Sequence, residues 1–131
     1  MDNGHTLGNH TYSHYNSYNT VSKQYVHDVE KADAILHSDL FRPPFGSLTL
    51  TSWIQLRKKY KIVFWTLNSN DFSGQQFNLE KSFMNLKKKT TAGDIILFHF
   101  CNKHENETKQ LIPLYLKWLS ENGFMSKGLA F

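Results

Sequence analysis

Residues 62–98 read IVFWTLNSNDFSGQQFNLEKSFMNLKKKTTAGDIILF, and this stretch decides the fold class. It begins and ends with short apolar runs, residues 62–65 and 95–98, which are typical of strands buried on both faces. Between these runs, residues 79–86 have the apolar spacing of a helix. The helical side chains expected to face inward are Leu79, Phe83, Met84 and Leu86. A strand, a helix and a second strand in this order predict parallel pairing with a right-handed crossover.

The same alternation extends to both sides of this stretch. Residues 21–37 and 49–59 carry apolar residues at helical spacing, and Thr49 is a suitable N-cap for the second of these helices. Residues 111–119 form the last predicted helix, and residues 124–129 a weaker closing strand. The pattern therefore predicts an α/β fold.

Length and composition indicate one folded domain covering residues 1–131. The apolar content of 40% in 131 residues is enough to bury a core and argues against disorder. No apolar run approaches the roughly 18 residues that would span a bilayer. The polar start of the chain contains no recognisable signal peptide, so the sequence leaves the compartment open.

The net charge of +4 comes largely from two basic clusters, residues 57–61 and 87–89. Each cluster lies at the end of a predicted helix, where cations complement the helix dipole and stay in water. A solvated face is therefore the preferred interpretation over a nucleic-acid patch, and no nucleic-acid partner is expected.

Two histidines near the start of the chain are candidate metal ligands. His10 and His14 lie four residues apart in the segment 4–14, and on a helical turn this spacing places both imidazoles on one face. They would then be close enough to share a divalent metal. The alternative is a pair of solvated or core histidines, because such spacings arise by chance in a chain with seven histidines.

Three further segments carry polar residues at the ends of strand-like runs. They are Arg42-Pro-Pro-Phe-Gly46, Trp65-Thr-Leu-Asn-Ser-Asn-Asp-Phe72 and Asp94-Ile-Ile-Leu-Phe-His99. His99 closes an apolar strand, where an imidazole needs a cleft or a partner, although a hydrogen-bonded core histidine is an alternative. Asp71 has the alternative of capping a turn, and Arg42 that of an ordinary surface arginine.

In this order and spacing, the four segments resemble four of the five signature segments of the polysaccharide deacetylases, the NodB-type carbohydrate esterases of family 4. The resemblance runs from about residue 4 to the C-terminus. It implies a distorted, incomplete (β/α) barrel with ligands at the carboxyl ends of the strands. It also implies hydrolytic removal of N- or O-acetyl groups from a polysaccharide such as peptidoglycan, chitin or xylan, usually outside the cytoplasm.

The resemblance assigns roles to individual residues. His10 and His14 match the two histidines that, with an aspartate, hold a divalent metal, most often zinc, with cobalt or nickel also compatible. His99 matches the general acid, Asp71 the carboxylate beside it, and Arg42 the arginine that orients the catalytic base. Asn9, Thr11 and Ser13 are expected to orient the histidines.

The resemblance also assigns substrate contacts, which fall to Pro43, Pro44, Phe45, Phe72 and Leu97. Phe45 would offer its backbone N–H to the oxyanion, and it stands where the family more often has tyrosine. Phe72 stands where the family usually has tryptophan. Leu97 would line the pocket for the acetyl methyl group, and plain core packing is the alternative.

The first signature segment of the family, Thr-Phe-Asp-Asp, is absent from this sequence. In the family it supplies the catalytic base and the third metal ligand. We therefore expect a truncated domain without its N-terminal strand or strands, with weak or no activity. An exposed strand edge would favour homo-oligomers. The alternative is a non-catalytic carbohydrate-binding or structural remnant of the fold.

Overall fold

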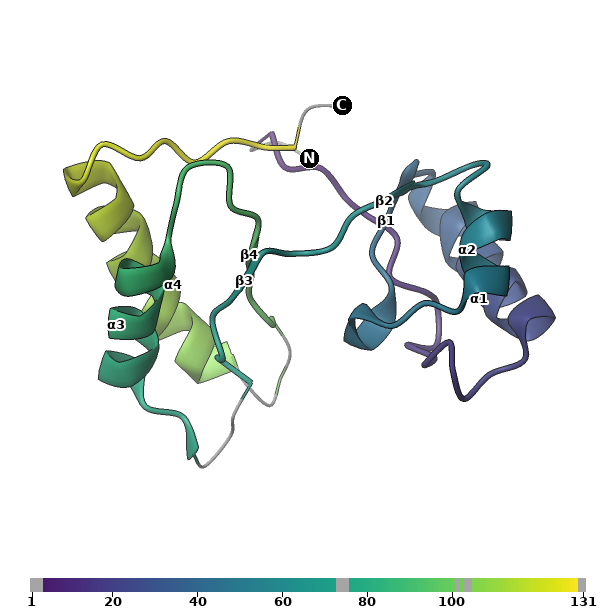
Figure 1. The fold of residues 1–131 in the computed structure, drawn as a ribbon, viewed down its shortest axis with the longest axis horizontal. Helices are drawn as coiled ribbons and strands as arrows, with labels where there is room; N and C mark the ends of the chain where they lie inside the picture. Colours follow the sequence, from purple (N-terminus) through teal and green to yellow (C-terminus); the bar gives the residue numbers. More distant parts are fainter. Residues whose placement is uncertain (1–3, 73–75, 101, 103–104, 130–131) are drawn as a thin grey trace. The chain divides into compact units, whose positions relative to one another are not determined.

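The computed structural model describes residues 4–72, 76–100, 102 and 105–129 (Figure 1). The chain folds as two compact units, Met1–Phe64 and Trp65–Phe131. Each unit contains one short parallel pair of strands and two α-helices. The expected α/β class is therefore confirmed, while the prediction of one domain over residues 1–131 stays a prediction.

The first unit contains the following elements: α1 (Ser22–Leu36), β1 (Leu40–Phe41), the 3-10 turn η1 (Pro44–Gly46), α2 (Leu50–Leu56) and β2 (Lys61–Ile62). β1 and β2 pair in parallel, with Phe41 opposite Ile62. Asn9 forms a further parallel bridge to Phe41, so the chain that leads into His10 runs beside β1. This bridge fixes the start of the histidine segment against the sheet.

The core of the first unit lies between its helices and its strands. α1 buries Tyr25, Val29 and Ala32, which recur at the spacing of one helical face. Tyr25 and Val29 pack with Phe41, Leu56 and Tyr60 in one cluster of buried side chains. The side chain of Thr49 accepts the N–H of Ser52 at 3.4 Å, which confirms the predicted N-cap of α2.

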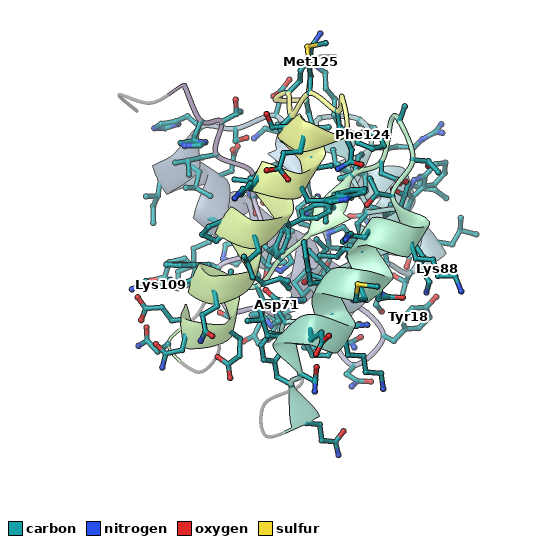
Figure 2. The ribbon with its side chains drawn as sticks, turned by 90° about the vertical axis from the view of Figure 1, so that its left-hand side faces the viewer. Tyr18, Asp71, Lys88, Lys109, Phe124 and Met125 are labelled. Carbon is teal, nitrogen blue, oxygen red and sulfur yellow. The ribbon has the colours of Figure 1, made fainter. Side chains whose placement is uncertain are left out.

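The second unit contains β3 (Leu67–Asn68), α3 (Leu79–Lys89), β4 (Ile96–Leu97) and α4 (Glu105–Glu121). β3 and β4 pair in parallel, and α3 packs against α4. Figure 2 shows the two helices side by side, with Lys88 and Lys109 at their outer edges. Their buried side chains form the core with the sheet: Leu67, Leu86, Leu111, Tyr115 and Leu119.

The strands differ from the prediction because each is only two residues long. Residues 62–65 are not buried on both faces, since Phe64 is 43% exposed. Within residues 95–98, Leu97 alone is fully buried, and both flanking side chains pack toward the helices. Residues 124–129 pair with no strand among the described residues, so the expected closing strand is wrong.

The helices follow the prediction more closely. α3 begins at the predicted residue, but Met84 is 55% exposed and does not face the core. α4 begins at Glu105, six residues earlier than the apolar pattern indicated, because its first turns are polar. None of the helices in the described part of the chain is long and apolar enough to cross a membrane.

The basic clusters lie on the surface, as expected. Lys59 forms an ion pair with Asp33 at 2.6 Å and Lys61 one with Asp39 at 3.0 Å. Lys87, Lys88 and Lys89 occupy the last turn of α3, where they complement the helix dipole.

Candidate active site

His10 and His14 lie in a loop, and not on the helical turn that their spacing predicted. The helical prediction is wrong because Thr11 and His14 have φ angles of 62° and 56°, in the left-handed region, which interrupts a right-handed helix. The two imidazoles nevertheless lie close together. Their ring centroids are 5.0 Å apart and the rings are inclined by 68°.

The loop is held by Asp28, a buried residue of α1 that the sequence analysis did not select. Its two carboxylate oxygens accept the backbone N–H and the hydroxyl of Ser13, each at 2.8 Å. Its backbone carbonyl accepts the N–H of Tyr12 at 3.2 Å. The signal was present in the sequence, because Asp28 falls on the same helical stripe as Tyr25 and Ala32, where a charge needs partners.

Asn9 anchors the other end of the loop. It is fully buried, its side-chain amide donates to the carbonyl of Val29 at 2.8 Å, and its oxygen accepts the N–H of Thr11 at 3.0 Å. Asn9 and Ser13 therefore shape the backbone that carries the histidines, and the expectation that Asn9, Thr11 and Ser13 orient the imidazoles stays a prediction.

The backbone of Arg42 contacts the first histidine directly. Nδ1 of His10 lies 2.6 Å from the carbonyl oxygen of Arg42, so the ring donates from Nδ1 and its lone pair is on Nε2. A hydrogen bond of this kind is typical of imidazoles that bind metals.

The Arg42 guanidinium donates to the carbonyls of Val63 and Phe64 at 3.3 and 3.4 Å. Burial lowers the pKa of Arg42, but an arginine stays charged in proteins.

The segment after Arg42 presents one side chain next to the histidines. Pro43 and Pro44 are fully buried, whereas Phe45 is 63% exposed and has a φ of 60°. The Phe45 ring centroid is 4.8 Å from that of His14, in an edge arrangement. Of the three substrate contacts predicted in this segment, Phe45 alone is therefore exposed.

The second unit holds a hydrogen-bonded pair formed by Asp71 and His99. Oδ1 of Asp71 is 2.8 Å from Nδ1 of His99, and Oδ2 accepts the backbone N–H of His99 at 2.7 Å. Asp71 is fully buried, while the His99 side chain is 36% exposed. The carboxylate orients the ring so that Nδ1 faces inward, and the exposed part of the ring is accessible for proton transfer.

Thr108 on α4 is a third member of this arrangement that the sequence analysis did not select. Its hydroxyl lies 2.9 Å from Oδ2 of Asp71 and 2.7 Å from the carbonyl oxygen of His99. Because the side chain is fully buried, it ties α4 to both residues. The polar first turns of α4 gave no apolar signal that would have selected it.

The environment of Asp71 favours its ionised form. Burial raises the pKa of this carboxyl, but hydrogen bonds from His99, Ser69 and Thr108 lower it, and the net pKa lies below the usual 3.8. Asp71 is therefore ionised at neutral pH and accepts a hydrogen bond from Nδ1–H of His99.

Of the two predicted substrate contacts of this unit, Phe72 contacts the ring of His99, whereas Leu97 is buried. The Phe72 ring centroid is 4.8 Å from that of His99, and the Phe72 side chain is exposed. Leu97 is buried, but among the described residues the core cluster includes its neighbours Ile96 and Phe98 and not Leu97. Leu97 therefore lies on the opposite face of the strand.

A profile of the family described as "Polysaccharide deacetylase" matches residues 1–65. The chain belongs to this family. A Bacillus cereus protein described as a peptidoglycan-N-acetylglucosamine deacetylase is 28% identical over 104 residues, which is 73% of this chain and 37% of that relative. The chain thus spans well under two thirds of this deacetylase.

Solved structures of the deacetylase family share the fold. A family 4 carbohydrate esterase from Streptomyces lividans, in complex with acetate, matches with a TM-score of 0.84 and 21% identity, covering 98% of this chain and 68% of that one. A Bacillus anthracis protein described as a CE4 family pseudoenzyme matches with a TM-score of 0.74 and 21% identity, covering 89% and 42%. The NodB-type α/β fold expected from the sequence is confirmed over most of the chain.

The donor atoms fit part of the metal site that the deacetylase family implies. His10 and His14 supply two imidazoles, a ligand type that suits zinc. Among the residues that the structure describes, however, no three or more His, Cys, Asp or Glu side chains form a group that could hold a metal. The described residues therefore offer two candidate ligands and no carboxylate grouped with them.

We expect Asp28→Ala to loosen the histidine loop. The substitution removes two hydrogen bonds to Ser13, so the free energy of unfolding should fall by about 1–3 kcal/mol in urea titrations. The His10 and His14 ring signals should also move in NMR spectra. Glu30→Ala, at an exposed position of the same helix, is the control and should change stability by less than about 0.5 kcal/mol. Equal losses in both variants would contradict the role of Asp28.

We expect Asp71→Asn to flatten the acid branch of the stability curve. Because the folded pKa of Asp71 lies below 3.8, its contribution to stability is present above the unfolded pKa and is lost as the pH falls through the folded pKa. The drop in unfolding free energy between pH 7 and pH 2.5 should be smaller in the variant. Urea titrations at several pH values measure this, and unchanged drops would refute it.

Proposed function

We propose that this chain acts in the hydrolytic deacetylation of N- or O-acetylated sugars in a polysaccharide of the peptidoglycan, chitin or xylan type. The observation that carries the proposal is the pair of Asp71 and His99. A buried carboxylate at 2.8 Å from an imidazole that reaches the surface is the arrangement of a positioned acid–base group.

The proposed step is the protonation of the leaving nitrogen. Hydrolysis of an acetamide forms a bond between the carbonyl carbon and a water oxygen and breaks the carbon–nitrogen bond, which gives acetate and an amine. His99 donates a proton from Nε2 to the nitrogen as that bond breaks, and the proton lost from the attacking water restores His99 through solvent. Asp71 accepts the Nδ1–H throughout and stabilises the ring while it is protonated.

We propose His10 and His14 as two ligands of a divalent metal, with zinc the first choice and cobalt or nickel as alternatives. When bound, such a metal lowers the pKa of a coordinated water and polarises the acetyl carbonyl. Phe45 would contact the substrate beside His14, and its backbone N–H would face the oxyanion. We assign no catalytic base and expect reduced activity, because this sequence contains no Thr-Phe-Asp-Asp segment.

A non-catalytic role in carbohydrate binding or structure is the second candidate. It is favoured by the lack of a third ligand near His10 and His14 among the described residues. The likeness to a protein described as a pseudoenzyme agrees with this reading, since the fold can be kept when activity is not.

The family relationship also suggests where the protein works and how it assembles. Because a relative is described as a peptidoglycan deacetylase, we propose a site of action outside the cytoplasm, at the cell envelope. We further propose that the chain forms homo-oligomers through an exposed strand edge.

The metal proposal predicts that zinc binding depends on the two loop histidines. The double variant His10→Ala/His14→Ala should weaken zinc binding at least tenfold in calorimetric titrations of the purified chain. The double variant His5→Ala/His27→Ala removes two exposed imidazoles of the same unit and serves as the control. Equal weakening in both variants would mean that zinc binds to scattered histidines.

The catalytic proposal predicts that His99→Gln lowers the rate of acetate release from acetylated chitin or peptidoglycan oligomers by about 100-fold or more. His27→Gln is the matched control and should leave the rate unchanged, because that side chain is exposed on α1. Sugar binding by a wild-type chain that releases no acetate would favour the non-catalytic candidate instead.

A further inference from the structure

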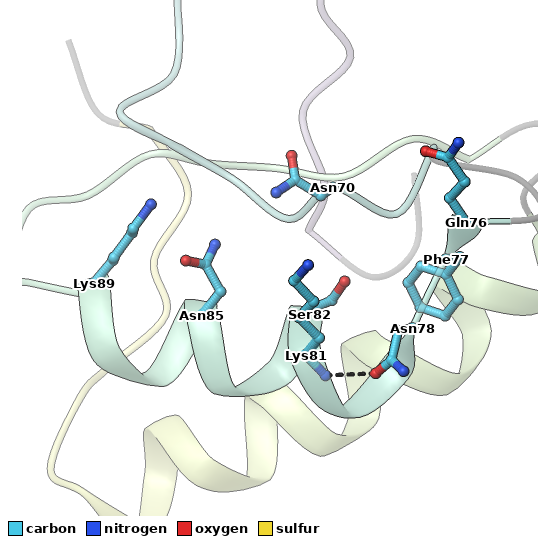
Figure 3. A pocket seen from close by; sticks show the side chains of 8 residues that line it. All are labelled: Asn70, Gln76, Phe77, Asn78, Lys81, Ser82, Asn85 and Lys89. Carbon is cyan, nitrogen blue, oxygen red and sulfur yellow. Dashed lines mark hydrogen bonds between the residues drawn. The ribbon is translucent and has the colours of Figure 1, made fainter.

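A polar groove of about 390 Å³ runs along α3 in the second unit (Figure 3). Its lining comes from three places: the loop after β3, the approach to α3, and one face of α3 itself. The side chains that matter for its chemistry are Asn70, Gln76, Phe77, Lys81, Asn85 and Lys89.

The face of α3 in the groove is cationic and rich in amides. Lys81, Asn85 and Lys89 are spaced by four residues, so they follow one another along the helix. In Figure 3 the Asn85 and Lys89 side chains rise from α3 toward the segment that carries Asn70. Among the described residues, neither lysine forms an ion pair with a carboxylate. Two ammonium groups of one sign are thus available to an anion.

This set of groups matches the chemistry of an acidic sugar. The amides of Asn70, Gln76 and Asn85 both donate and accept hydrogen bonds, as hydroxyl and acetamido groups require. The ammonium groups can form charge-assisted hydrogen bonds with a carboxylate. Phe77 offers the one aromatic surface in the lining, against which the C–H face of a sugar ring can pack. A purely apolar ligand would leave the two ammonium groups without an anionic partner.

The groove and the Asp71–His99 pair share one loop. Asn70 has a φ of 58°, and its N–H donates to the side-chain oxygen of Asn68 at 2.9 Å. This left-handed residue turns the chain between the groove, which Asn70 lines, and the buried position of Asp71. Consecutive Cα atoms are about 3.8 Å apart, so an occupant that contacts Asn70 lies next to the residue that orients His99.

We propose that this groove is a binding subsite for a carboxylate-bearing, N-acetylated sugar of the polysaccharide that the chain acts on. The proposal rests on the proposed deacetylase function and narrows its substrate to acidic glycans. Lys81 and Lys89 bind the carboxylate, and the amides of Asn70 and Asn85 bind the neighbouring polar groups. A neutral chitin-type or xylan-type chain lacks the group that the two lysines recognise.

The test compares an acidic with a neutral disaccharide on the full chain. The probes are the disaccharide of N-acetylglucosamine and N-acetylmuramic acid, which carries a carboxylate, and di-N-acetylchitobiose, which does not. NMR titration should give signal shifts at Asn70, Gln76 and Asn85 with the acidic probe and affinity at least fivefold higher than for the neutral one. Lys81→Gln/Lys89→Gln should weaken binding of the acidic probe at least fivefold.

The matched control is Lys87→Gln/Lys88→Gln, which removes the same charge from the last turn of α3 outside the groove and should change affinity less than twofold. A second variant, Asn85→Asp, adds a negative charge to the groove and should weaken the acidic probe alone. Equal affinity for both probes, equal weakening in both lysine variants, or no binding of the acidic probe would each overturn the proposal. Tighter binding of a hexathymidine oligonucleotide than of the acidic disaccharide would also overturn the proposal, in favour of a nucleic-acid ligand.

Binding is read out separately from catalysis, so the two proposals fail in different ways. Acetate release from chitin oligomers without binding of the acidic probe would overturn the subsite and leave the deacetylase proposal standing. In His99→Gln, the deacetylase proposal predicts lower acetate release. The subsite proposal predicts that the affinity of the same variant for the acidic probe changes less than twofold.

Discussion

The buried carboxylate of Asp71 is the group on which the arrangement of the second unit depends. A buried ionised group is unfavourable unless each of its oxygens is hydrogen-bonded. Asp71 meets this condition, because its two oxygens accept hydrogen bonds from the ring and the backbone N–H of His99 and from the hydroxyl of Thr108 on α4. In addition, the backbone N–H of Asp71 donates to the Ser69 hydroxyl at 3.3 Å. The ends of both strands and the first turns of α4 are thereby drawn to one point. His99 is held there as a consequence of satisfying the carboxylate.

The first unit uses a second buried carboxylate in a different way. Asp28 lies inside the unit on α1 and accepts two hydrogen bonds from Ser13, while Asn9 anchors the other end of the same loop to the chain of α1. The carboxylate of Asp71 orients a ring directly, whereas that of Asp28 fixes the backbone from which two rings project. The positions of His10 and His14 thus depend on hydrogen bonds between their loop and α1.

The spacing of apolar residues predicted the helices because each helix repeats its buried positions over several turns, as Tyr25, Val29 and Ala32 do in α1. It failed for the strands, since two residues cannot establish an alternation. The family resemblance singled out His99 and Asp71, which the structure places 2.8 Å apart. Neither Asp28 nor Thr108 was selected from the sequence. The apolar stripe of α1 marks Asp28 as a charge that needs partners, but its partner lies 15 residues away, and that of Thr108 lies 37 residues away, so only the folded chain identifies these partners. The left-handed conformation of Thr11 also has no signature in residue type, since threonine does not favour this conformation.

Phe45 shows how the demands of folding and of function diverge at one position. A phenylalanine with a φ of 60° carries about 1–2 kcal/mol of backbone strain that a glycine would not. The same backbone conformation brings its ring to the edge of His14. A library of variants selected for thermal stability alone should therefore enrich glycine at this position, whereas selection for ligand binding should keep the aromatic ring.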